Sequence, residues 1–491
     1  MMNSNDFKKI KFGDADAETE LLFEPELLKN GFIDDFGFID DLVSRRKYLV
    51  YGLKGSGKTA IGSRIELLYG QKDMTVEKFT LERFNYPLFE GMGYSNSEKS
   101  NRNHSHKNSN TENNRTWEMI LDVALLGMFF KDPNFNKNPK EIRSFVDNLK
   151  EAGVLSDNDL SLIVNKMSKK SFIANIHIFK YNFETTESKT ENYRAMYDSL
   201  REAVNSIRIS KQCIMVLDGL DSVVDNTEVQ IRVLSGLLHA TNEINITLAR
   251  NQIPAKIVLL CRRDLLDMLK DPNKQKIIDD YGIELDWFQE GADRDDINLI
   301  RLLNKRASLS LGKDVNIFDE FFKEYISNKK TYKFMLEHTR HIPRDMVRLI
   351  NEIQKIYVDA DKTNINKAID AYSADYFYGE VENEMVGIMK DGEFDFIMDL
   401  FSRLHKYRTS QRELELKAEE IGHKVSKDDM GRILTLLYNV GAIGNVSRVD
   451  EKDRYQFKYR NRWSSYNSSD EIVIHFALQK ALNVRGGFKR D

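Results

Sequence analysis

Short apolar runs between residues 47 and 261 predict the strands of a sheet. These runs are residues 47–51, 75–81, 213–217 and 256–261. The last two lack the alternation of apolar and polar positions that marks a strand with one solvent-exposed face. Such uninterrupted runs are typical of parallel strands that helices cover on both faces. We therefore expect a central parallel sheet.

Most of the remaining chain has the apolar spacing of helices. Helical spacing covers residues 117–164, with a turn near Pro133, then 192–209, and nearly all of 293–380. Residues 170–183 alternate enough to predict a strand or a hairpin. Residues 95–115 are rich in Asn and Ser and cannot bury a core, so we expect a loop there.

The last hundred residues have a different order of elements. Helical patterns are followed by two apolar runs on either side of a charged turn at 450–453, and a final helix is predicted at 471–483. Three helices followed by a β-hairpin is the element order of a winged helix. The three helices are predicted at 394–405, 411–421 and 427–439, and the hairpin strands at 442–446 and 455–460.

The most specific motif in the chain is GLKGSGKT at residues 52–59, which matches G-x-x-x-x-G-K-[ST]. It follows a predicted strand and opens an amphipathic helical pattern at 60–68. The glycines let consecutive backbone N–H groups turn inward, and the helix N-terminus adds partial positive charge, so this segment is predicted to cradle phosphate groups. The residues expected to bind the nucleotide are Gly52, Lys54, Gly55, Ser56, Gly57, Lys58, Thr59 and Ala60.

A nucleoside triphosphate site also needs groups that hold Mg²⁺ and orient water. Lys58 is expected to reach the β- and γ-phosphates, while the Thr59 hydroxyl and Asp218, at the end of a neighbouring strand, hold Mg²⁺. The alternative for Asp218 is a turn or helix cap. Gly219 stands where many hydrolysing enzymes place Glu, so Asp221 is our candidate for orienting the attacking water. If Asp221 does not do so, the protein is a slow nucleotide switch.

Two arginines are candidates for sensing the γ-phosphate. Arg262 ends the last of the predicted strands, and the alternative for it is a salt bridge with Asp264 or Asp267. Arg344 follows Pro343 at the start of a predicted helix, where a mobile lid would bring it onto the γ-phosphate.

On these residues the chain resembles the AAA+ and STAND group of P-loop ATPases, above all bacterial stand-alone members with a C-terminal winged helix that occur beside phage-defence genes. Residues 52–59 look like a Walker A motif and the run ending at Asp218 looks like a Walker B motif. Arg262 and Arg344 are similar to the sensor 1 and sensor 2 arginines. Two phrases, ELDW at 284–287 and IHFAL at 474–478, are also similar to this group. The chain departs from the group in the missing Glu after Asp218 and in the Walker A–Walker B spacing of about 160 residues.

The expected fold is therefore α/β, a three-layer P-loop NTPase core with a central parallel sheet and a long, mostly helical insertion. A helical lid and a C-terminal winged-helix domain follow. Ligands of such sheets bind beyond the carboxyl ends of the strands. The expected domains are an N-terminal lead-in at 1–46, the ATPase core at 47–292 with its insertion at about 85–210, the lid at 293–391, and the winged helix at 392–491.

Composition adds only a cellular location to this picture. The chain has 491 residues and a net charge of −4, and its two cysteines, Cys213 and Cys261, sit in predicted strands as small core residues, which suits a reducing compartment. No signal-peptide pattern opens the sequence, and the longest apolar run, 119–130, is too short to cross a bilayer. We expect a cytoplasmic protein with no membrane contact.

Three functions remain open. The first is an ATPase or ATP-driven switch that forms homo-oligomers in a bacterial defence or signalling complex, with ATP and Mg²⁺ as cofactors. The second is a nucleotide-gated module that binds DNA or RNA, although Asp428 and Asp429 open its recognition helix. The third is a scaffold whose insertion, 95–210, binds a protein partner. Residues available to the second function are Lys424, Lys427, Arg432, Arg448, Lys452, Arg454, Lys458 and Arg460.

Overall fold

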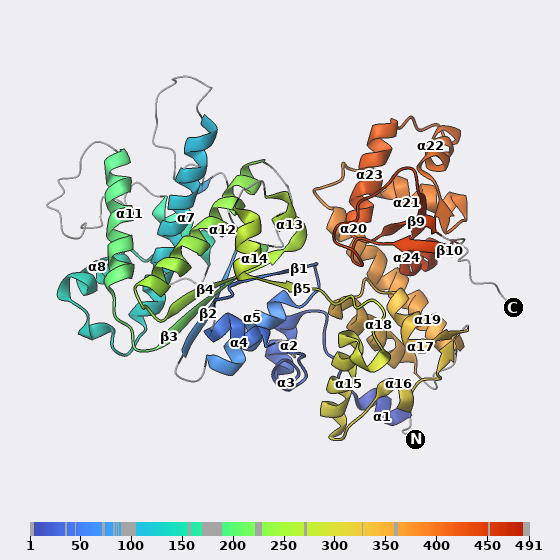
Figure 1. The fold of residues 1–491 in the computed structure, drawn as a ribbon, viewed down its shortest axis with the longest axis horizontal. Coiled ribbons are helices and arrows are strands. Elements are labelled where there is room, and N and C mark those ends of the chain that lie inside the picture. Colours follow the sequence, from blue (N-terminus) through green and yellow to red (C-terminus); the bar gives the residue numbers. More distant parts are fainter. Residues whose placement is uncertain are drawn as a thin grey trace. The chain divides into compact units, whose positions relative to one another are not determined.

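The protein is described from a computed structural model (Figure 1). Its chain forms two compact units, which are described separately. The core unit comprises Asp34–Lys54 and Lys58–Leu285, and the C-terminal unit comprises Met1–Ile33, Gly55–Gly57 and Asp286–Asp491. The residues that the structure describes are 4–34, 37–44, 46–70, 74–81, 84, 86, 88–89, 105–155, 159–168, 189–220, 228–269, 273–326, 328–357, 362–449 and 452–484.

A five-stranded parallel sheet forms the centre of the core unit, with the strand order β2–β3–β4–β1–β5. All four strands predicted from apolar runs are confirmed, and β5 is a further strand that the pattern did not predict. The residues of β1 and β3 are almost all buried, as expected for strands covered on both faces. The strands are β1 (Leu49–Gly52), β2 (Met74–Thr80), β3 (Gln212–Asp218), β4 (Ala255–Arg262) and β5 (Gly282–Leu285).

Helices cover both faces of this sheet, as Figure 1 shows for the core unit. One face carries α4 (Phe38–Ser44) and α5 (Lys58–Tyr69), and the other carries α7 (Ser105–Phe130), α12 (Glu228–Arg250), α13 (Arg263–Met268) and α14 (Lys274–Tyr281). Trp117 on α7 is fully buried and its indole N–H donates to the Val233 carbonyl of α12 at 2.7 Å. The described residues between β2 and β3 are mostly helical, and their further helices pack on α7: α8 (Lys140–Glu151), α9 (Leu160–Met167) and α11 (Lys189–Ser206).

The order of strands corrects one expectation about the site. Asp218 is expected on a strand next to β1, but β4 lies between β3 and β1. The register of β1 and β4 pairs Gly52 with Arg262. Arg262 therefore ends the strand that lies directly beside the strand of the glycine-rich loop.

Three further expectations about local structure change. Residues 105–115, expected to be a loop, belong to α7. The apolar second half of α7 is buried and already helical, and extending an existing helix fixes only one residue for each hydrogen bond gained, so the polar residues before it can also be helical. The predicted helix at 471–483 begins instead as a strand, β11 (Glu471–Ile474), whose buried Ile472, Val473 and Ile474 suit a sheet. Lys452 and Asp453 lie in a strand rather than a turn. The strand or hairpin predicted at 170–183 lies outside the described residues.

The C-terminal unit starts with helices from the beginning of the chain and continues with those of residues 298–385. These helices surround a buried apolar cluster that runs from Phe7 to Val484. A short π-helix, Ser373–Phe377, continues α19 into α20. The helices are α1 (Ser4–Lys9), α2 (Ala17–Phe23), α3 (Pro25–Asn30), α15 (Asn298–Leu311), α16 (Ile317–Glu320), α17 (Thr331–Glu337), α18 (Pro343–Ile356), α19 (Lys362–Tyr372) and α20 (Tyr378–Met385), with a small hairpin of β6 (Tyr325–Ile326) and β7 (Lys329–Lys330).

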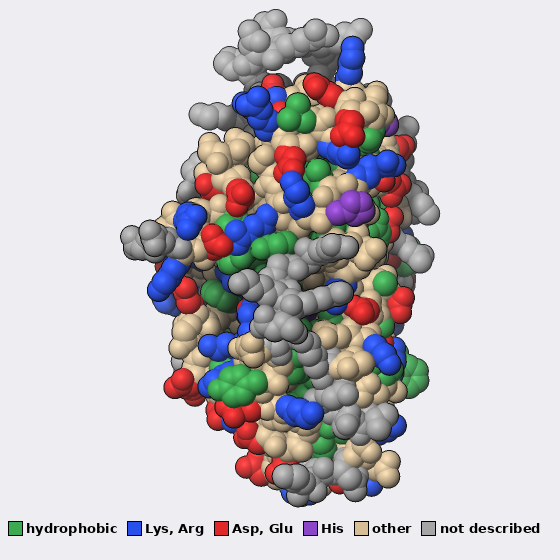
Figure 2. All heavy atoms as spheres, turned by 90° about the vertical axis from the view of Figure 1, so that its right-hand side faces the viewer, with side chains coloured by type: hydrophobic (Ala, Val, Ile, Leu, Met, Phe, Trp, Pro, Cys, Tyr) green, Lys and Arg blue, Asp and Glu red, His purple; other side chains and the backbone are tan. Residues whose placement is uncertain are grey.

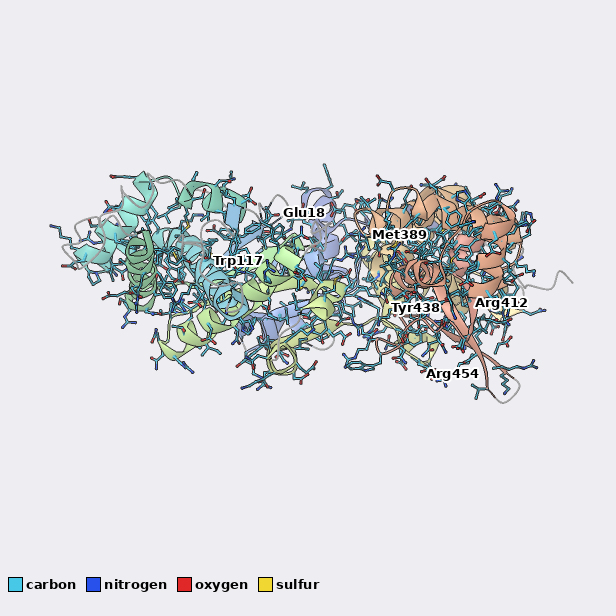
Figure 3. The ribbon with its side chains drawn as sticks, turned by 90° about the horizontal axis from the view of Figure 1, so that it is seen from above. Glu18, Trp117, Met389, Arg412, Tyr438 and Arg454 are labelled. Carbon is cyan, nitrogen blue, oxygen red and sulfur yellow. The ribbon has the colours of Figure 1, made fainter. Side chains whose placement is uncertain are left out.

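The described residues from 393 to 481 form four helices and a four-stranded antiparallel sheet, in the strand order β10–β9–β11–β8. Figure 3 shows Tyr438 on α23 and Arg454 on the hairpin of β9 and β10. The three predicted helices are confirmed. These elements are α21 (Glu393–Leu404), β8 (Arg408–Thr409), α22 (Gln411–Glu420), α23 (Lys427–Asn439), β9 (Ile443–Val449), β10 (Lys452–Gln456), β11 (Glu471–Ile474) and α24 (Phe476–Ala481). Within the described residues, no helix has the length and hydrophobicity needed to cross a membrane.

A buried ion pair fixes the start of the chain in the C-terminal unit. The guanidinium of Arg306 on α15 binds both carboxylate oxygens of Glu20 on α2, at 2.7 and 2.9 Å. The same guanidinium donates to the Phe12 carbonyl at 2.5 Å, and Asn351 and Gln354 of α18 donate to the Gly13 carbonyl and to those of Phe7 and Ile10. Phe7, Phe12 and Glu20 are therefore part of this unit's core.

Replacing Glu20 with Ala leaves the buried Arg306 guanidinium without its counter-charge, and we expect it to destabilise the C-terminal unit by about 3–5 kcal/mol. Urea denaturation measures this change. The matched control is Asp399→Ala, which removes the partner of the exposed Arg403 and should leave the stability nearly unchanged. Equal losses in the two variants would contradict the assignment.

Candidate functional site

The glycine-rich loop at 52–59 connects β1 directly to α5. Gly55 and Gly57 have φ angles of +79° and +96°, a region that residues with a Cβ atom rarely adopt. The two glycines turn the chain sharply enough for α5 to begin at Lys58, immediately beyond the loop. A buried strand, a left-handed turn and a helix N-terminus together form the arrangement that binds anions through backbone N–H groups.

The two glycines differ in their surroundings. A Cβ atom on Gly55 would lie 2.9 Å from the Arg344 Cβ and 3.0 Å from the Ile342 Cδ1, whereas a Cβ on Gly57 would meet no described atom within 4 Å. The backbone N–H of Arg344 also donates to the Gly55 carbonyl at 3.3 Å. One side of the loop is therefore packed against the start of α18, and the side at Gly57 is open.

Lys58 is the first residue of α5 and its side chain folds back over the loop. It is buried, and its ammonium group donates to the carbonyl oxygens of Gly52 and Leu53 at 3.4 and 3.1 Å. Two neutral carbonyl oxygens only partly compensate a buried ammonium charge. A phosphate in the loop would supply the missing negative charge. The Thr59 and Ala60 side chains follow in the first turn of α5 and are half-buried, like Lys54 in the loop.

Asp218 lies at the carboxyl end of β3. Its carboxylate accepts a hydrogen bond from the Gly219 N–H at 2.8 Å and forms an ion pair with Lys78 of β2 at 3.4 Å. It is therefore held by its own turn and by β2 and is not bonded to Thr59. Asp221, the candidate for orienting water, lies outside the described residues.

Arg262 forms the salt bridge that was the alternative to a sensing role. Its Nε and Nη2 donate to the two carboxylate oxygens of Asp264, at 2.9 and 2.5 Å. The next residue, Arg263, pairs with Glu284 of β5 at 2.8 Å. Glu284 opens the ELDW phrase, so this phrase places a counter-charge beside the end of β4.

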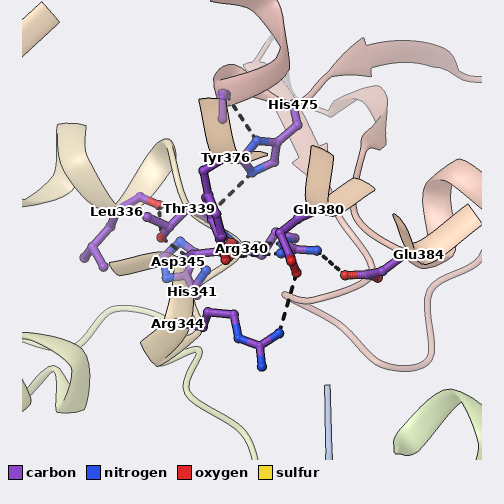
Figure 4. Close-up of polar contacts among 11 residues, drawn as sticks. Leu336, Thr339, Arg340, His341, Arg344, Asp345, Tyr376, Glu380, Glu384 and His475 are labelled. Carbon is purple, nitrogen blue, oxygen red and sulfur yellow. Dashed lines mark hydrogen bonds and ion pairs between the residues drawn. The ribbon is translucent and has the colours of Figure 1, made fainter. Parts of the chain in front are cut away.

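Arg344 is the second residue of α18 and its guanidinium has two partners in the C-terminal unit, of which Figure 4 shows Glu380. Its Nε donates to the Ala15 carbonyl at 3.0 Å, and its Nη1 lies 3.6 Å from a carboxylate oxygen of Glu380. The side chain is thus held between the start of the chain and α20. Contact with a γ-phosphate remains a prediction for both Arg262 and Arg344.

A buried polar cluster fixes the helix that carries Arg344 (Figure 4). Arg340 donates to both carboxylate oxygens of Asp345 at 3.0 and 2.9 Å and to Glu384 at 2.7 Å, and Tyr376 donates to Asp345 at 3.1 Å. Burial by itself would raise the pKa of Asp345, but the Arg340 guanidinium and these hydrogen bonds hold it below its usual range. The cluster joins the start of α18 to α20 within one core.

Three histidines lie near this cluster: His338 and His475 are buried, and His341 is half-buried. Burial lowers the pKa of His338 to about 4 and that of His341 to about 3, and it also lowers the pKa of His475. The Nδ1 of His475 accepts a hydrogen bond from the Ala477 N–H at 3.2 Å, which caps α24, and its ring stacks on Phe377 at 4.7 Å. The IHFAL phrase at 474–478 is thus a buried helix start that packs against the π-helix.

Sequence reasoning also missed Trp287. Its indole N–H donates to the Ser56 carbonyl in the glycine-rich loop at 2.9 Å. The signal available in the sequence was its position two residues after β5, because β5 pairs with β1 and so ends near the loop.

The loop residues fit a phosphate-bearing ligand. The Ser56 Oγ is buried and has no hydrogen-bond partner among the described residues, and a buried hydroxyl without a partner costs about 1–3 kcal/mol. In the described part of the chain, no group of three His, Cys, Asp or Glu side chains is placed to hold a metal ion. Mg²⁺ that enters with a nucleotide needs fewer protein ligands, because phosphate oxygens and water supply the rest.

Comparison with known proteins matches parts of the chain. Residues 297–378 match the FunZ-associated C-terminal helical domain, a family model for the helices from α15 to α19. The transposon gamma-delta 80.3 kDa protein of Escherichia coli (strain K12) is 22% identical over 298 residues, which are 56% of this chain and 41% of that protein. The chain thus spans about two fifths of this curated relative. Cdc6p from Pyrobaculum aerophilum aligns over 96% of this chain and 98% of its own, with 11% identity and a TM-score of 0.28, which is too low to establish a shared fold.

The low pKa of His338 predicts that stability falls in acid. In the unfolded chain the pKa returns to about 6.5, so the folded state binds fewer protons and its stability is complete above that value and is lost as the pH falls toward 4. His338→Phe removes this proton uptake. We expect the wild type to lose about 2 kcal/mol more than the variant between pH 7 and pH 5, measured by urea denaturation.

The control for this measurement is His423→Gln, because His423 is exposed. This variant should keep the full pH dependence of the wild type. A His338→Phe protein with the same pH dependence as the wild type would show that His338 is already accessible to protons in the folded state.

Proposed function

We propose that the protein is an ATP-binding P-loop ATPase or an ATP-driven molecular switch of the AAA+/STAND type. The observation that carries the proposal is the loop at 52–59. It joins a buried parallel strand to a helix N-terminus through two left-handed glycines and places the buried Lys58 over its own carbonyls. This geometry suits the phosphates of a nucleotide. The choice of ATP over GTP rests on the family resemblance alone.

In this proposal the residues of the chain bind and orient the triphosphate. The N–H groups of the loop and the Lys58 ammonium hold its charge, and Thr59 and Asp218 would hold Mg²⁺, which neutralises the β- and γ-phosphate oxygens when bound. Asp218 would exchange its ion pair with Lys78 for this role. Arg262 and Arg344 remain candidates for contacting the γ-phosphate, and each would first have to leave its present partner.

The rate of hydrolysis depends on Asp221 in this proposal, because Gly219 has no side chain to orient water. A carboxylate of ordinary pKa can orient water without removing its proton in advance. Oligomerisation, a role in a bacterial defence or signalling complex, and a protein partner on the helical segment between β2 and β3 are further proposals. Their support is the resemblance to stand-alone STAND proteins.

Phosphate release from Mg²⁺-ATP, with Lys58→Ala as the comparison, tests this function. Removing the buried ammonium should abolish turnover and weaken ATP binding at least tenfold, because it takes away the side-chain charge facing the phosphates. Lys47→Ala is the matched control, since Lys47 lies before the other end of β1 and its ammonium group donates to the Asp279 carbonyl; it should leave turnover and ATP binding unchanged. Turnover that survives in Lys58→Ala would contradict the proposal.

The second candidate is a nucleotide-gated DNA- or RNA-binding protein that uses the C-terminal helices and hairpin as a winged helix. The observation in its favour is the hairpin, where Arg448, Lys452 and Arg454 are exposed. Against it, Asp428 is exposed and Asp429 is half-buried at the start of α23, and Arg432 is paired with Glu393. Basic and acidic side chains are also intermingled on the face shown in Figure 2.

Duplex DNA binding at 50 and 300 mM salt, followed by fluorescence anisotropy, tests the second candidate. If the hairpin contacts phosphates, replacing Arg448, Lys452 and Arg454 with Ala should weaken binding and reduce the salt slope by about 2 to 3. A triple variant of the exposed Lys8, Lys9 and Lys29 changes the net charge equally and should bind like the wild type. Equal effects of both triple variants would reject a hairpin-specific site.

A further inference from the structure

The glycine-rich loop is held from outside by two hydrogen bonds to consecutive carbonyl groups. The Arg344 backbone N–H donates to the Gly55 carbonyl at 3.3 Å, and the Trp287 indole N–H donates to the Ser56 carbonyl at 2.9 Å. All four residues belong to the C-terminal unit. We call these two bonds the loop clamp.

The loop clamp determines where two backbone donors point. In a trans peptide the C=O and N–H bonds point in opposite directions. The Gly55 carbonyl shares its peptide with the Ser56 N–H, and the Ser56 carbonyl shares its peptide with the Gly57 N–H. A bond that fixes each carbonyl toward Arg344 or Trp287 therefore fixes the following N–H toward the opposite side.

The opposite side is where a phosphate would lie. A Cβ added to Gly55 would collide with Ile342 and Arg344, while the space around a Cβ on Gly57 is empty within 4 Å of the described atoms. Neither the Ser56 N–H nor the Gly57 N–H has an acceptor among the described residues. Both donors are left for a ligand.

We propose that Trp287 is a positioning residue for the phosphate site: its indole N–H pre-orients the Gly57 N–H, and with Arg344 the Ser56 N–H, toward the phosphates of the bound nucleotide. This inference rests on the proposed function. Donors that are already oriented need no reorganisation when the ligand binds, so the clamp adds affinity for phosphate groups without touching them.

Trp287→Phe tests the clamp, because it keeps an aromatic ring and removes the indole N–H. We expect the Kd for Mg²⁺-ATP and for Mg²⁺-ADP to rise about three- to tenfold, the effect of losing one hydrogen bond. The other two tryptophans are matched controls. Trp117 donates to a carbonyl of the core unit and Trp463 is 77% exposed, so Trp117→Phe and Trp463→Phe should leave both Kd values unchanged.

Hydrogen–deuterium exchange of a peptide covering 53–59 measures the loop directly, without nucleotide. It therefore distinguishes a local change in the loop from a weaker affinity or a loss of the fold. In the absence of nucleotide this peptide should exchange faster in Trp287→Phe than in the wild type, while peptides from α15 and α18 exchange equally. Unchanged exchange at 53–59, or unchanged Kd values in Trp287→Phe, would overturn the inference. A wild-type protein that binds neither Mg²⁺-ATP nor Mg²⁺-ADP would overturn the proposed function itself.

Discussion

The left-handed turn at Gly55 and Gly57 is the constraint on which the candidate site depends. It lets a buried strand, β1, run into a helix, α5, with almost no intervening chain, and so aligns backbone N–H groups with the helix N-terminus. Residues with a side chain cannot easily replace these glycines. Both have a positive φ angle, and a Cβ atom on Gly55 would also collide with Ile342 and Arg344. The loop is thus defined both by its own backbone and by its packing against α18.

A second constraint is the single core of the C-terminal unit. The apolar cluster contains Phe7 from the start of the chain, Met346 from α18 and Leu478 from α24. Buried polar groups lie inside it, with Arg340 bound to Asp345 and Glu384, and the neutral His475 stacked on Phe377. Because a buried charge that loses its partner is costly, the start of α18 has few alternative positions while these contacts persist. Arg344, which lies at the start of α18, is therefore held in position for its hydrogen bond to the loop.

Most of the core unit could be predicted from the sequence, because its strands are apolar runs and its loop has a specific glycine spacing. The missed strand, β5, has only four residues, too few to show a period. The N-terminal part of α7 was missed because its polar composition is typical of a loop. It is helical because it continues the buried, apolar half of the same helix. The order of strands, which places Arg262 beside Gly52, depends on packing over long sequence distances and has no local signal.

The candidate site shows the same division. Lys58, Thr59 and the glycines belong to one short motif, and they could be predicted from the sequence. Trp287 contacts the Ser56 carbonyl of the loop, and the Ala15 carbonyl accepts a hydrogen bond from Arg344. Each of these bonds joins residues more than 200 positions apart in the sequence. A single indole N–H or a single backbone carbonyl leaves no recognisable motif in the sequence. The pairing of Arg262 with Asp264, two residues away, was visible as an alternative because it is local.

The most direct test of the central claim is a calorimetric titration of the wild-type protein and of Gly57→Val with a slowly hydrolysed Mg²⁺-ATP analogue. The variant changes the open side of the loop, where a side chain would meet no described atom, so it blocks the phosphate position and strains φ without disturbing the contacts to α18. We expect one saturable site per wild-type chain and no measurable binding in the variant. Equal binding by both proteins, or no binding by the wild type, would contradict it.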